Sequence, residues 1–321
     1  MARSIRKANR IIWLRRSVQT LFLLLFLYLF LQTAYHPIDR TGGPVTLFFD
    51  FDPLVLAATW LAGAAVPPAL LMSLTTLGFS VFLGRSFCGW VCPFGTVHHI
   101  FSRLRSGRLA ARLKRTVYSP WQKSKYLVLI ALLAGVLTGL NLVGWLDPFS
   151  LLYRSLATAV FPALNLSLHA LFGWLYYADP GIGGARITKV SEPVYEILRS
   201  YLLVEEQPQY YTGILIGAIF GGIVALNLWR ARFWCRYVCP LGALLGIAGK
   251  NPVLRLKKDD AACNNCRLCA AVCPGGASPD ALSGESEGWK PAECLFCWNC
   301  RAVCPKQALS FEFEVPSRKQ S

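Results

Sequence analysis

Eight of the twelve cysteines in this chain lie near its C-terminal end, in two runs that share one spacing. Residues 263–274 read CNNCRLCAAVCP, and residues 294–305 read CLFCWNCRAVCP. Both runs follow the pattern C-x2-C-x2-C-x3-C-P, a spacing at which soft thiolates hold a [4Fe–4S] cubane. The two runs therefore predict two iron–sulfur clusters.

In a duplicated run of this kind, the fourth cysteine of each copy binds the cluster of the other copy. By that rule the first cluster takes Cys263, Cys266, Cys269 and Cys304, and the second takes Cys294, Cys297, Cys300 and Cys273. Paired structural zinc sites are the alternative, because four thiolates also suit zinc. The third cysteine step and the trailing proline are unusual for zinc and favour clusters.

The other four cysteines form two CxxxCP pairs much earlier in the chain. Residues 87–95 read FCGWVCPFG, and residues 234–242 read WCRYVCPLG. In each copy an arginine precedes the first cysteine by three residues. Because proline suits the first turn of a helix, we expect helices to begin at Pro93 and Pro240. The thiolates would then benefit from the potential of a helix N-terminus and from the nearby arginines.

Three interpretations of these four cysteines compete. The favoured one is a single iron–sulfur site shared by the two motifs, with the ligands Cys88, Cys92, Cys235 and Cys239. The second is a site for another metal, such as copper, or a redox-active set of thiols. The third is that the cysteines only pack at the ends of the spans. Two CxxxCP copies in matched settings argue against this third interpretation.

The elements that must position these cysteines are apolar. We expect four membrane spans, at residues 17–36, 67–84, 124–146 and 211–229, and a short interfacial helix at 54–65. Residues 149–177 are also apolar. Arg154, Pro162, Asn165 and His169 interrupt that stretch, so it is predicted to form interfacial helices rather than a span.

Charge predicts the orientation of these spans. The chain carries 33 Lys and Arg against 17 Asp and Glu, a net charge of +16. Basic residues crowd the N-terminus and the loop 85–123, whereas 37–53 and 147–209 are acidic on balance. Basic loops stay in the cytoplasm, so both chain ends are predicted to be cytoplasmic. This topology explains the positive charge without a nucleic-acid partner.

The two halves of the membrane part repeat each other. Each half runs span, Asp-Pro, apolar helix, span and CxxxCP, with DPL at 52–54 and DPF at 147–149. Both copies enter from the same side, so a pseudo-twofold axis along the membrane normal would bring the CxxxCP pairs face to face. The predicted fold is an α-helical membrane protein of four transmembrane helices, built as a duplicated two-span unit, with a C-terminal α+β two-cluster bacterial-ferredoxin domain. The membrane domain covers 1–250, with a periplasmic insertion at 147–209, and the cytoplasmic ferredoxin domain covers 251–321.

The motifs FCGWVCP and WCRYVCPLGALLG, followed by the two cluster runs, resemble those of NapH-type membrane polyferredoxins over residues 15–312. The membrane cores of NosR and CcoG are similar. The resemblance implies a multi-pass protein of the bacterial inner membrane that passes electrons between the quinone pool and a redox partner, as a subunit of a quinol dehydrogenase or a related oxidoreductase complex. A CcoG-like role in copper reduction or metalloenzyme assembly is the alternative. The segment 150–209 is long for a NapH-like chain and is a candidate surface for a periplasmic partner.

Several further residues have weaker signals. His98 and His99 follow the first CxxxCP pair and are candidates for hydrogen bonds to a quinone, although ordinary interfacial histidines are the simpler interpretation. Asp52 and Asp147 each precede a proline, which predicts that both cap helices. Trp90 and Tyr237 stand between paired cysteines and are predicted to pack over whatever the thiols hold.

Overall fold

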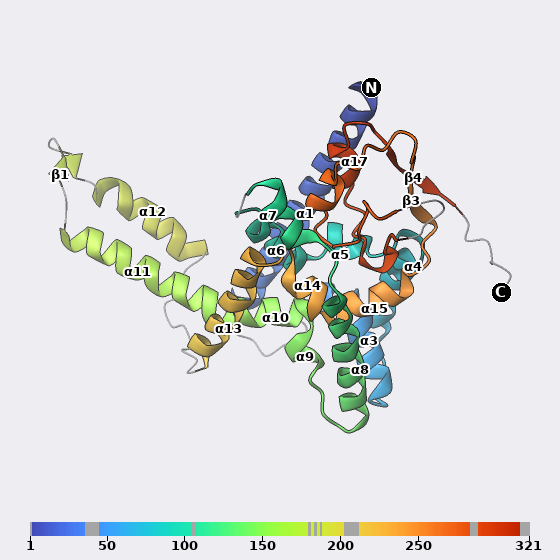
Figure 1. Ribbon diagram of the computed structural model, residues 1–321. Coiled ribbons are helices and arrows are strands. Elements are labelled where there is room, and N and C mark those ends of the chain that lie inside the picture. The colour runs from blue at the N-terminus through green and yellow to red at the C-terminus, as the bar shows by residue number, and fades with distance from the viewer. Residues whose placement is uncertain are drawn as a thin grey trace. The chain divides into compact units, whose positions relative to one another are not determined.

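The computed structural model describes residues 2–35, 45–104, 107–178, 181–182, 185–186, 188–201, 212–282 and 288–314. Residues 36–44 and 202–211 lie outside this set; they include the end of the first predicted span and the last part of the predicted insertion 147–209. The chain forms two compact units, one made of residues 1–151 with 223–321 and the other of 152–222. Figure 1 shows the elements of both units, coloured from blue at the N-terminus to red at the C-terminus.

The first unit is mostly helical, and the elements before residue 152 form its first part. Its first helices are α1 (Ala2–Tyr35), α2 (Thr46–Asp50), α3 (Pro53–Leu61), η1 (Pro68–Met72), α4 (Ser73–Leu83), α5 (Ser86–Trp90), α6 (Pro93–Leu104), α7 (Leu109–Thr116), η2 (Pro120–Lys123), α8 (Ser124–Leu137) and α9 (Val143–Leu146). The predicted helix start at Pro93 is confirmed by α6.

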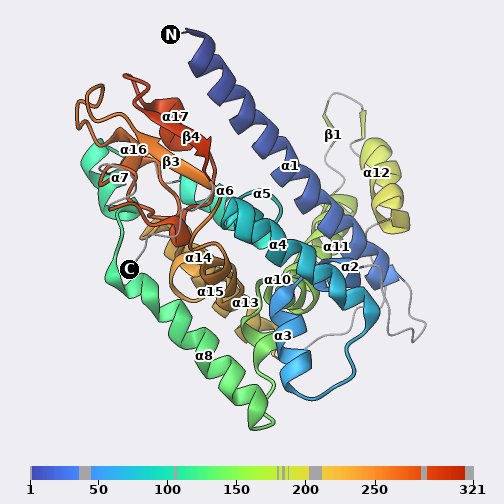
Figure 2. The ribbon, with the colours of Figure 1, turned by 90° about the vertical axis from the view of Figure 1, so that its right-hand side faces the viewer.

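The later part of this unit carries the second CxxxCP motif and the cluster runs. Its elements are α13 (Gly213–Ala225), which starts in the other unit, then η4 (Leu226–Leu228), α14 (Phe233–Tyr237), α15 (Pro240–Ala248), β3 (Leu254–Lys258), α16 (Leu268–Ala271), η5 (Pro291–Glu293), α17 (Asn299–Val303) and β4 (Leu309–Phe313). The helix α15 starts at Pro240 as predicted. In Figures 1 and 2 the strand pair lies at one end of this unit and α3 lies toward the other.

Helix α1 buries one stripe along its length. The buried residues are Ile12, Arg15, Gln19, Phe26 and Phe30, whose spacing of three, four and seven places them on one face. The two polar members make long-range contacts. Arg15 donates to Asn299 Oδ1 at 3.2 Å, and Gln19 donates to the Gly89 carbonyl at 2.6 Å. One face of α1 therefore contacts both the second cluster run, at Asn299, and the first CxxxCP motif, at Gly89.

Two helices among the described residues have the length and composition to cross a membrane, namely Asn9–Thr33 and Pro148–Ala178. Pro68–Leu83 and Gly213–Leu228 are apolar but shorter. The helix in the predicted span 124–146 ends early, at Leu137. There Gly139 takes a φ of +83°, Gly139 N–H donates to the Val136 carbonyl at 3.0 Å, and Leu140 N–H donates to the Gly135 carbonyl at 2.8 Å. These two bonds form the glycine C-cap that commonly ends a helix.

The prediction that residues 149–177 are interrupted was wrong, whereas their interfacial position stays a prediction. They form one continuous helix from α10 (Pro148–Ser155) through a π-helical segment, η3 (Leu156–Val160), to α11 (Phe161–Ala178). The ring of Pro162 would clash with the carbonyl four residues earlier in a regular helix. The wider π turn just before it, closed by Phe161 N–H on the Leu156 carbonyl, absorbs that conflict.

The second unit also contains β1 (Gly181–Ile182), β2 (Ala185–Arg186) and α12 (Thr188–Tyr201). The strands pair antiparallel. Tyr195 of α12 packs on α11, with its hydroxyl 2.8 Å from His169 Nδ1 and its ring 5.1 Å from that of Phe172. His169, one of the residues expected to break the apolar run, thus holds α12 against the helix.

The C-terminal cluster runs surround a small core under the β3–β4 pair. The strands are antiparallel, from Leu254 opposite Phe313 to Lys258 opposite Leu309. Residues alternate between faces along a strand, so Leu254 and Leu256 point inward while Lys257 points out. The core consists of Leu254, Leu256, Ala277, Leu282, Trp289, Phe296, Cys300 and Leu309.

Candidate metal centres

The eight cysteines of the C-terminal runs line two separate cavities. A cavity of about 200 Å³ is lined by Cys263, Cys266, Cys269 and Cys304. A smaller one, of about 20 Å³, is lined by Cys273, Cys294, Cys297 and Cys300. Each group of four contains three cysteines of one run and the last cysteine of the other. These are the same groupings that the crossed-ligand rule assigns to the two clusters.

The backbone of both runs bends in the same way around its second cysteine. Asn265 and Arg267 flank Cys266 with φ of +54° and +58°, and Phe296 and Trp298 flank Cys297 with φ of +47° and +62°. A non-glycine residue in this region costs about 1–2 kcal/mol. Each run therefore has this backbone strain at two residues, the ones that curve the chain around its thiols. Backbone strain of this kind is commonly found at functional sites.

Burial raises the pKa of the thiols in the second group, that of Cys273 to about 11 and those of Cys294 and Cys300 well above the usual value. Neighbouring thiols act in the same direction. A thiol must lose its proton to bind a metal, so a positive charge has to compensate for burial. Iron bound between four such thiols supplies that charge, and the donor set suits it.

The four cysteines of the CxxxCP motifs converge although they are far apart in the chain. Cys88 lies in α5 and Cys235 in α14, while Cys92 and Cys239 immediately precede α6 and α15. All four are buried. Electrostatic interactions link Cys92 with Cys235, and Cys239 with both Cys88 and Cys92. The thiols of the two motifs therefore lie close enough to act on one another electrostatically.

Matching hydrogen bonds support the second cysteine of each motif. Gly95 N–H donates to Cys92 Sγ at 3.4 Å, and Gly242 N–H donates to Cys239 Sγ at 3.2 Å. Glycine is needed for this approach, because a Cβ at residue 95 would lie 2.7 Å from the Cys88 carbonyl oxygen. The glycine of each V-C-P-x-G motif thus lets a helix N-terminus come close to a sulfur atom.

The two repeat-related arginines cross over between the motifs. Arg85 Nη2 donates to the Cys235 carbonyl at 3.0 Å, and Arg232 Nη1 donates to the Cys88 carbonyl at 3.0 Å. Each arginine thus holds the first cysteine of the opposite copy. This reciprocity is what a pseudo-twofold axis through the four thiols requires.

These arginines are also almost entirely buried, with 1% and 0% of their surface exposed. Arg85 Nε, and Arg232 Nε and Nη2, have no hydrogen-bond partner within the described part of the chain. A buried cation is costly unless an anion lies nearby. Four thiolates around a metal cluster carry negative charge, and the N–H groups of Arg85 and Arg232 that lack an acceptor fit a centre of that kind. Among the described residues, however, no group of three or more His, Cys, Asp or Glu side chains is arranged to hold a metal ion.

A buried carboxylate connects this region to the cluster runs. Glu293, just before Cys294, accepts from Arg85 Nη1 at 3.1 Å, Gln122 Nε2 at 3.2 Å and Lys125 Nζ at 2.5 Å. Trp90 Nε1 donates to the Phe296 carbonyl at 3.1 Å. The CxxxCP motif and the second cluster run are thereby held in a fixed relation.

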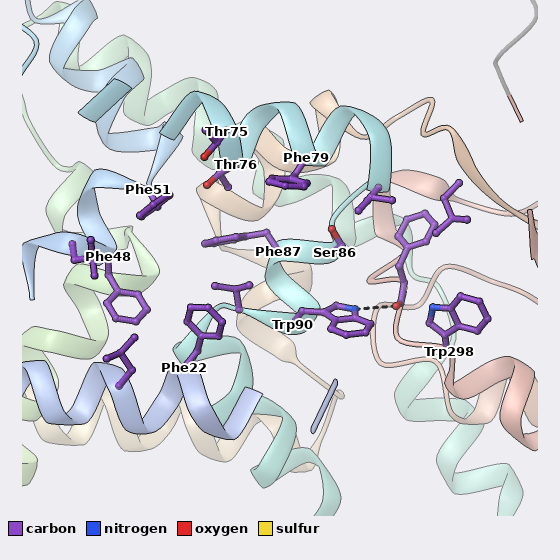
Figure 3. A pocket seen from close by; sticks show the side chains of 16 residues that line it. Phe22, Phe48, Phe51, Thr75, Thr76, Phe79, Ser86, Phe87, Trp90 and Trp298 are labelled. Carbon is purple, nitrogen blue, oxygen red and sulfur yellow. Dashed lines mark hydrogen bonds between the residues drawn. The ribbon is translucent and has the colours of Figure 1, made fainter. Parts of the chain in front are cut away.

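An apolar cavity of about 550 Å³ opens beside these contacts (Figure 3). Phe87, Trp90 and Val91, which flank Cys88 and Cys92, line one part of it, and Phe296 and Trp298, which flank Cys297, line another. The remaining lining residues are Phe22, Leu25, Leu47, Phe48, Phe51, Thr75, Thr76, Phe79, Leu83, Ser86 and Leu254. Its few polar groups are the hydroxyls of Thr75, Thr76 and Ser86 and the indole nitrogens, which suits a largely apolar ligand with a small polar part.

The two histidines of α6 do not line this cavity. His98 is buried with Nδ1 2.9 Å from Asn227 Oδ1, and burial lowers its pKa to about 4. His99 is also buried, and burial followed by the charge of Arg232 lowers its pKa well below the usual value. Both rings are therefore neutral at pH 7. Sequence reasoning instead missed the cavity lining, because its aromatic residues come from separate helices.

Both parts of the chain match families of iron–sulfur domains. A family described as "4Fe-4S binding domain" matches twice, at residues 65–112 and 212–259, and a "4Fe-4S dicluster domain" matches at 255–305. The first two matches fall on the two CxxxCP copies, which supports the predicted internal repeat. The third falls on the two cluster runs.

Relatives over most of the chain carry ferredoxin-type names. The ferredoxin-type protein NapH of Haemophilus influenzae is 26% identical over 95% of this chain and 90% of its own length. NapH of Escherichia coli is 25% identical over 83% and 77%. The methylamine utilization ferredoxin-type protein MauN of Paracoccus denitrificans is 26% identical over 73% and 68%. The resemblance to NapH-type polyferredoxins is confirmed, and no solved structure matches the chain.

Proposed function

We propose that this ferredoxin-type iron–sulfur protein carries electrons in the bacterial inner membrane, between the quinone pool and a redox partner. It uses three iron–sulfur centres. Two lie in the C-terminal runs, and the third is shared by Cys88, Cys92, Cys235 and Cys239. The observation that carries the proposal is the crossed pair Arg85 and Arg232, two buried cations that each hold the opposite CxxxCP motif and leave N–H groups unpartnered.

The chain's own residues hold the centres close to one another. Arg15 reaches Asn299 beside Cys300, and Cys297 acts on the pKa of that arginine. Glu293, the residue before Cys294, pairs with Arg85, and Arg85 interacts electrostatically with Cys88 and Cys239 of the four-thiol group. Bound clusters would supply one-electron redox chemistry, while these side chains fix their separation, exclude water and offset their negative charge.

The membrane topology that we propose keeps four spans with both chain ends in the cytoplasm. Because the two CxxxCP motifs converge, the chain must cross the membrane an even number of times between residues 92 and 235. The predicted spans at 124–146 and 211–229 provide two crossings. The helix Pro148–Ala178 would then lie outside the set of spans, in the segment that we propose to face a periplasmic partner.

The apolar cavity of Figure 3 is the best candidate for a quinone site in this scheme. It has the largely apolar walls that a lipid-soluble quinone needs, and it runs from the residues around Cys88 to those around Cys297. A quinone ring there would lie between the four-thiol group and the second cluster. Phe87, Trp90 and Trp298 would orient the ring and exclude water, and the hydroxyl groups would position its oxygens.

Iron counting tests the proposed centres. The protein purified without oxygen is expected to hold about twelve iron atoms, four for each cubane. Replacing Cys88 and Cys235 by serine should lower this to about eight and remove one redox-active signal from the electron paramagnetic resonance spectrum. The matched control, Cys266→Ser, should affect a cluster of the C-terminal runs instead.

Two results would contradict the proposal. One is unchanged iron in the Cys88 and Cys235 variants. The other is bound copper that disappears only when these two thiols are replaced, which would favour the CcoG-like role in copper reduction or metalloenzyme assembly.

A further inference from the structure

A second large cavity, of about 670 Å³, lies among α1, α6, α7 and the cluster-bearing helices α16 and α17. Helix α1 packs against α6 and α17, and α7 packs against α16 (Figure 2). The proposed electron path does not use this cavity. Its charged lining is entirely basic among the described residues and consists of Arg16, Arg103, Arg112 and Arg115.

No acidic side chain lines this cavity among the residues that the structure describes. Arg16, Arg103 and Arg112 form no ion pair with any carboxylate that the structure describes. Burial, followed by the charges of Arg16 and Arg232, lowers the pKa of Arg103. The positive charges of Arg16 and Arg232 therefore repel that of Arg103, and an anion in the cavity would relieve this repulsion.

A buried histidine adds a polar atom that lacks a partner. His99 lines the cavity with only 7% of its surface exposed, and its Nε2 has no hydrogen-bond partner among the described residues. Arg16 Nε is likewise buried without a partner in the same part of the chain. Buried polar atoms are normally satisfied, so these two indicate that a ligand completes the site. Arg16 Nε–H requires an acceptor oxygen, and His99 can donate to one in the tautomer that carries its proton on Nε2. A phosphate group has such oxygens and the required negative charge.

The apolar surroundings indicate that the phosphate belongs to a lipid. Ile12 and Trp13 of α1 also line the cavity, and Trp13 is exposed. Leu14, Leu21 and Leu24 continue along α1 and are all exposed, at 58%, 63% and 58%. Tryptophan favours the membrane interface, and basic pockets between helices on the cytoplasmic side recognise anionic headgroups. Acyl chains could then follow the leucines.

We propose that the cavity lined by Arg16, His99, Arg103 and Arg112 binds the phosphate headgroup of an anionic phospholipid. The placement of this cavity at a membrane surface rests on the proposed function. The lipid would hold α1, α6 and α7 against the two helices that carry cluster ligands. Its headgroup would also offset the positive charge beside the second cluster.

Lipid retention tests this proposal. The full-length protein in detergent would be mixed with phosphatidylglycerol or phosphatidylcholine, and bound lipid would be counted by native mass spectrometry. The double variant Arg103→Gln with Arg112→Gln is expected to bind phosphatidylglycerol roughly 30-fold more weakly, from the usual contribution of two basic residues to anionic-lipid binding. Phosphatidylcholine binding should be weak and unchanged. The variant Arg103→Lys with Arg112→Lys, which keeps the charge, should retain most of the binding.

A second double variant provides the matched control. Arg108→Gln with Lys114→Gln removes the same net charge from exposed side chains that do not line the cavity, and it should bind phosphatidylglycerol as the wild type does. Equal loss in both double variants would overturn the proposal, because only the overall charge would then matter. Displacement of the lipid by millimolar inorganic phosphate would show a free-phosphate site and overturn the lipid assignment. Iron measured on the same samples separates this outcome from failure of the proposed electron-transfer function.

Discussion

The two aspartates of the repeated Asp-Pro motifs meet inside the protein. Asp52 caps α3 through a bond from Leu54 N–H to Oδ1 at 2.7 Å, and Asp147 caps α10 through a bond from Ser150 N–H to Oδ2 at 2.8 Å. Both side chains are 0% exposed, and no described residue donates a hydrogen bond to their second oxygens. The two carboxyl groups lie within hydrogen-bonding reach of each other. Two carboxylates in such contact must share a proton.

This shared proton sets the pH dependence of stability. Burial, and then the charge of Asp147, raises the pKa of Asp52 well above its usual value, and burial raises that of Asp147. In the unfolded chain both groups ionise near pH 4. From about pH 4 up to the raised native pKa, the native state therefore binds one more proton than the unfolded state. The free energy of unfolding then falls by about 1.4 kcal/mol for each pH unit.

The change Asp52→Asn isolates this effect. Asparagine keeps a cap acceptor for Leu54 N–H, and its amide can donate to the second oxygen of Asp147. Asp147 would then carry its negative charge without a second carboxylate beside it. The variant is expected to be less stable than the wild type near pH 5 and more stable near pH 9, with a much flatter dependence between these values.

Denaturant unfolding at a series of pH values, followed by tryptophan fluorescence, would measure these curves. Infrared spectroscopy should show a protonated carboxyl band in the wild type that is lost in Asp52→Asn. Asp50→Asn is the control, because Asp50 is a half-buried neighbour on α2 outside the pair. If the Asp52→Asn curve runs parallel to the wild-type curve, the carboxyl groups do not share a proton and the reasoning fails.

Two further predictions concern the contacts around the thiols. Glu293→Gln leaves the buried cations Arg85 and Lys125 without their carboxylate and should lower the free energy of unfolding by about 3–5 kcal/mol, whereas the exposed Glu312→Gln should change it little. If denaturation showed the same loss of stability for Glu293→Gln and Glu312→Gln, burial of the Glu293 ion pairs would not matter for stability. Gly242→Ala places a Cβ 2.5 Å from Arg85 Nη2. It should lower the free energy of unfolding by about 1–3 kcal/mol and also lower the amount of bound iron. Gly221→Ala, whose Cβ would have nothing within 4 Å, should change neither quantity.

Local patterns in the sequence were sufficient for several elements and failed for others. Pro93 and Pro240 start helices as predicted, because a proline acts on the backbone of its immediate neighbours. The end of α8 at Leu137 was missed, although Gly139 is a recognisable cap residue. The continuous helix through Pro162 was missed because a π turn, which depends on local geometry rather than composition, removes the conflict that the proline creates.

The sequence by itself determined the iron–sulfur character of the protein, because ligand spacing along a short run is a local property. It also determined the repeat, since two CxxxCP copies with matched arginines and Asp-Pro motifs are visible without a fold. Only the tertiary structure decided how the copies meet. The bond from Arg85 to the Cys235 carbonyl joins residues 150 positions apart, and Asp52 likewise meets an aspartate of the other repeat, Asp147. Such contacts depend on how helices pack, and no periodicity within one segment records which distant side chain it will face.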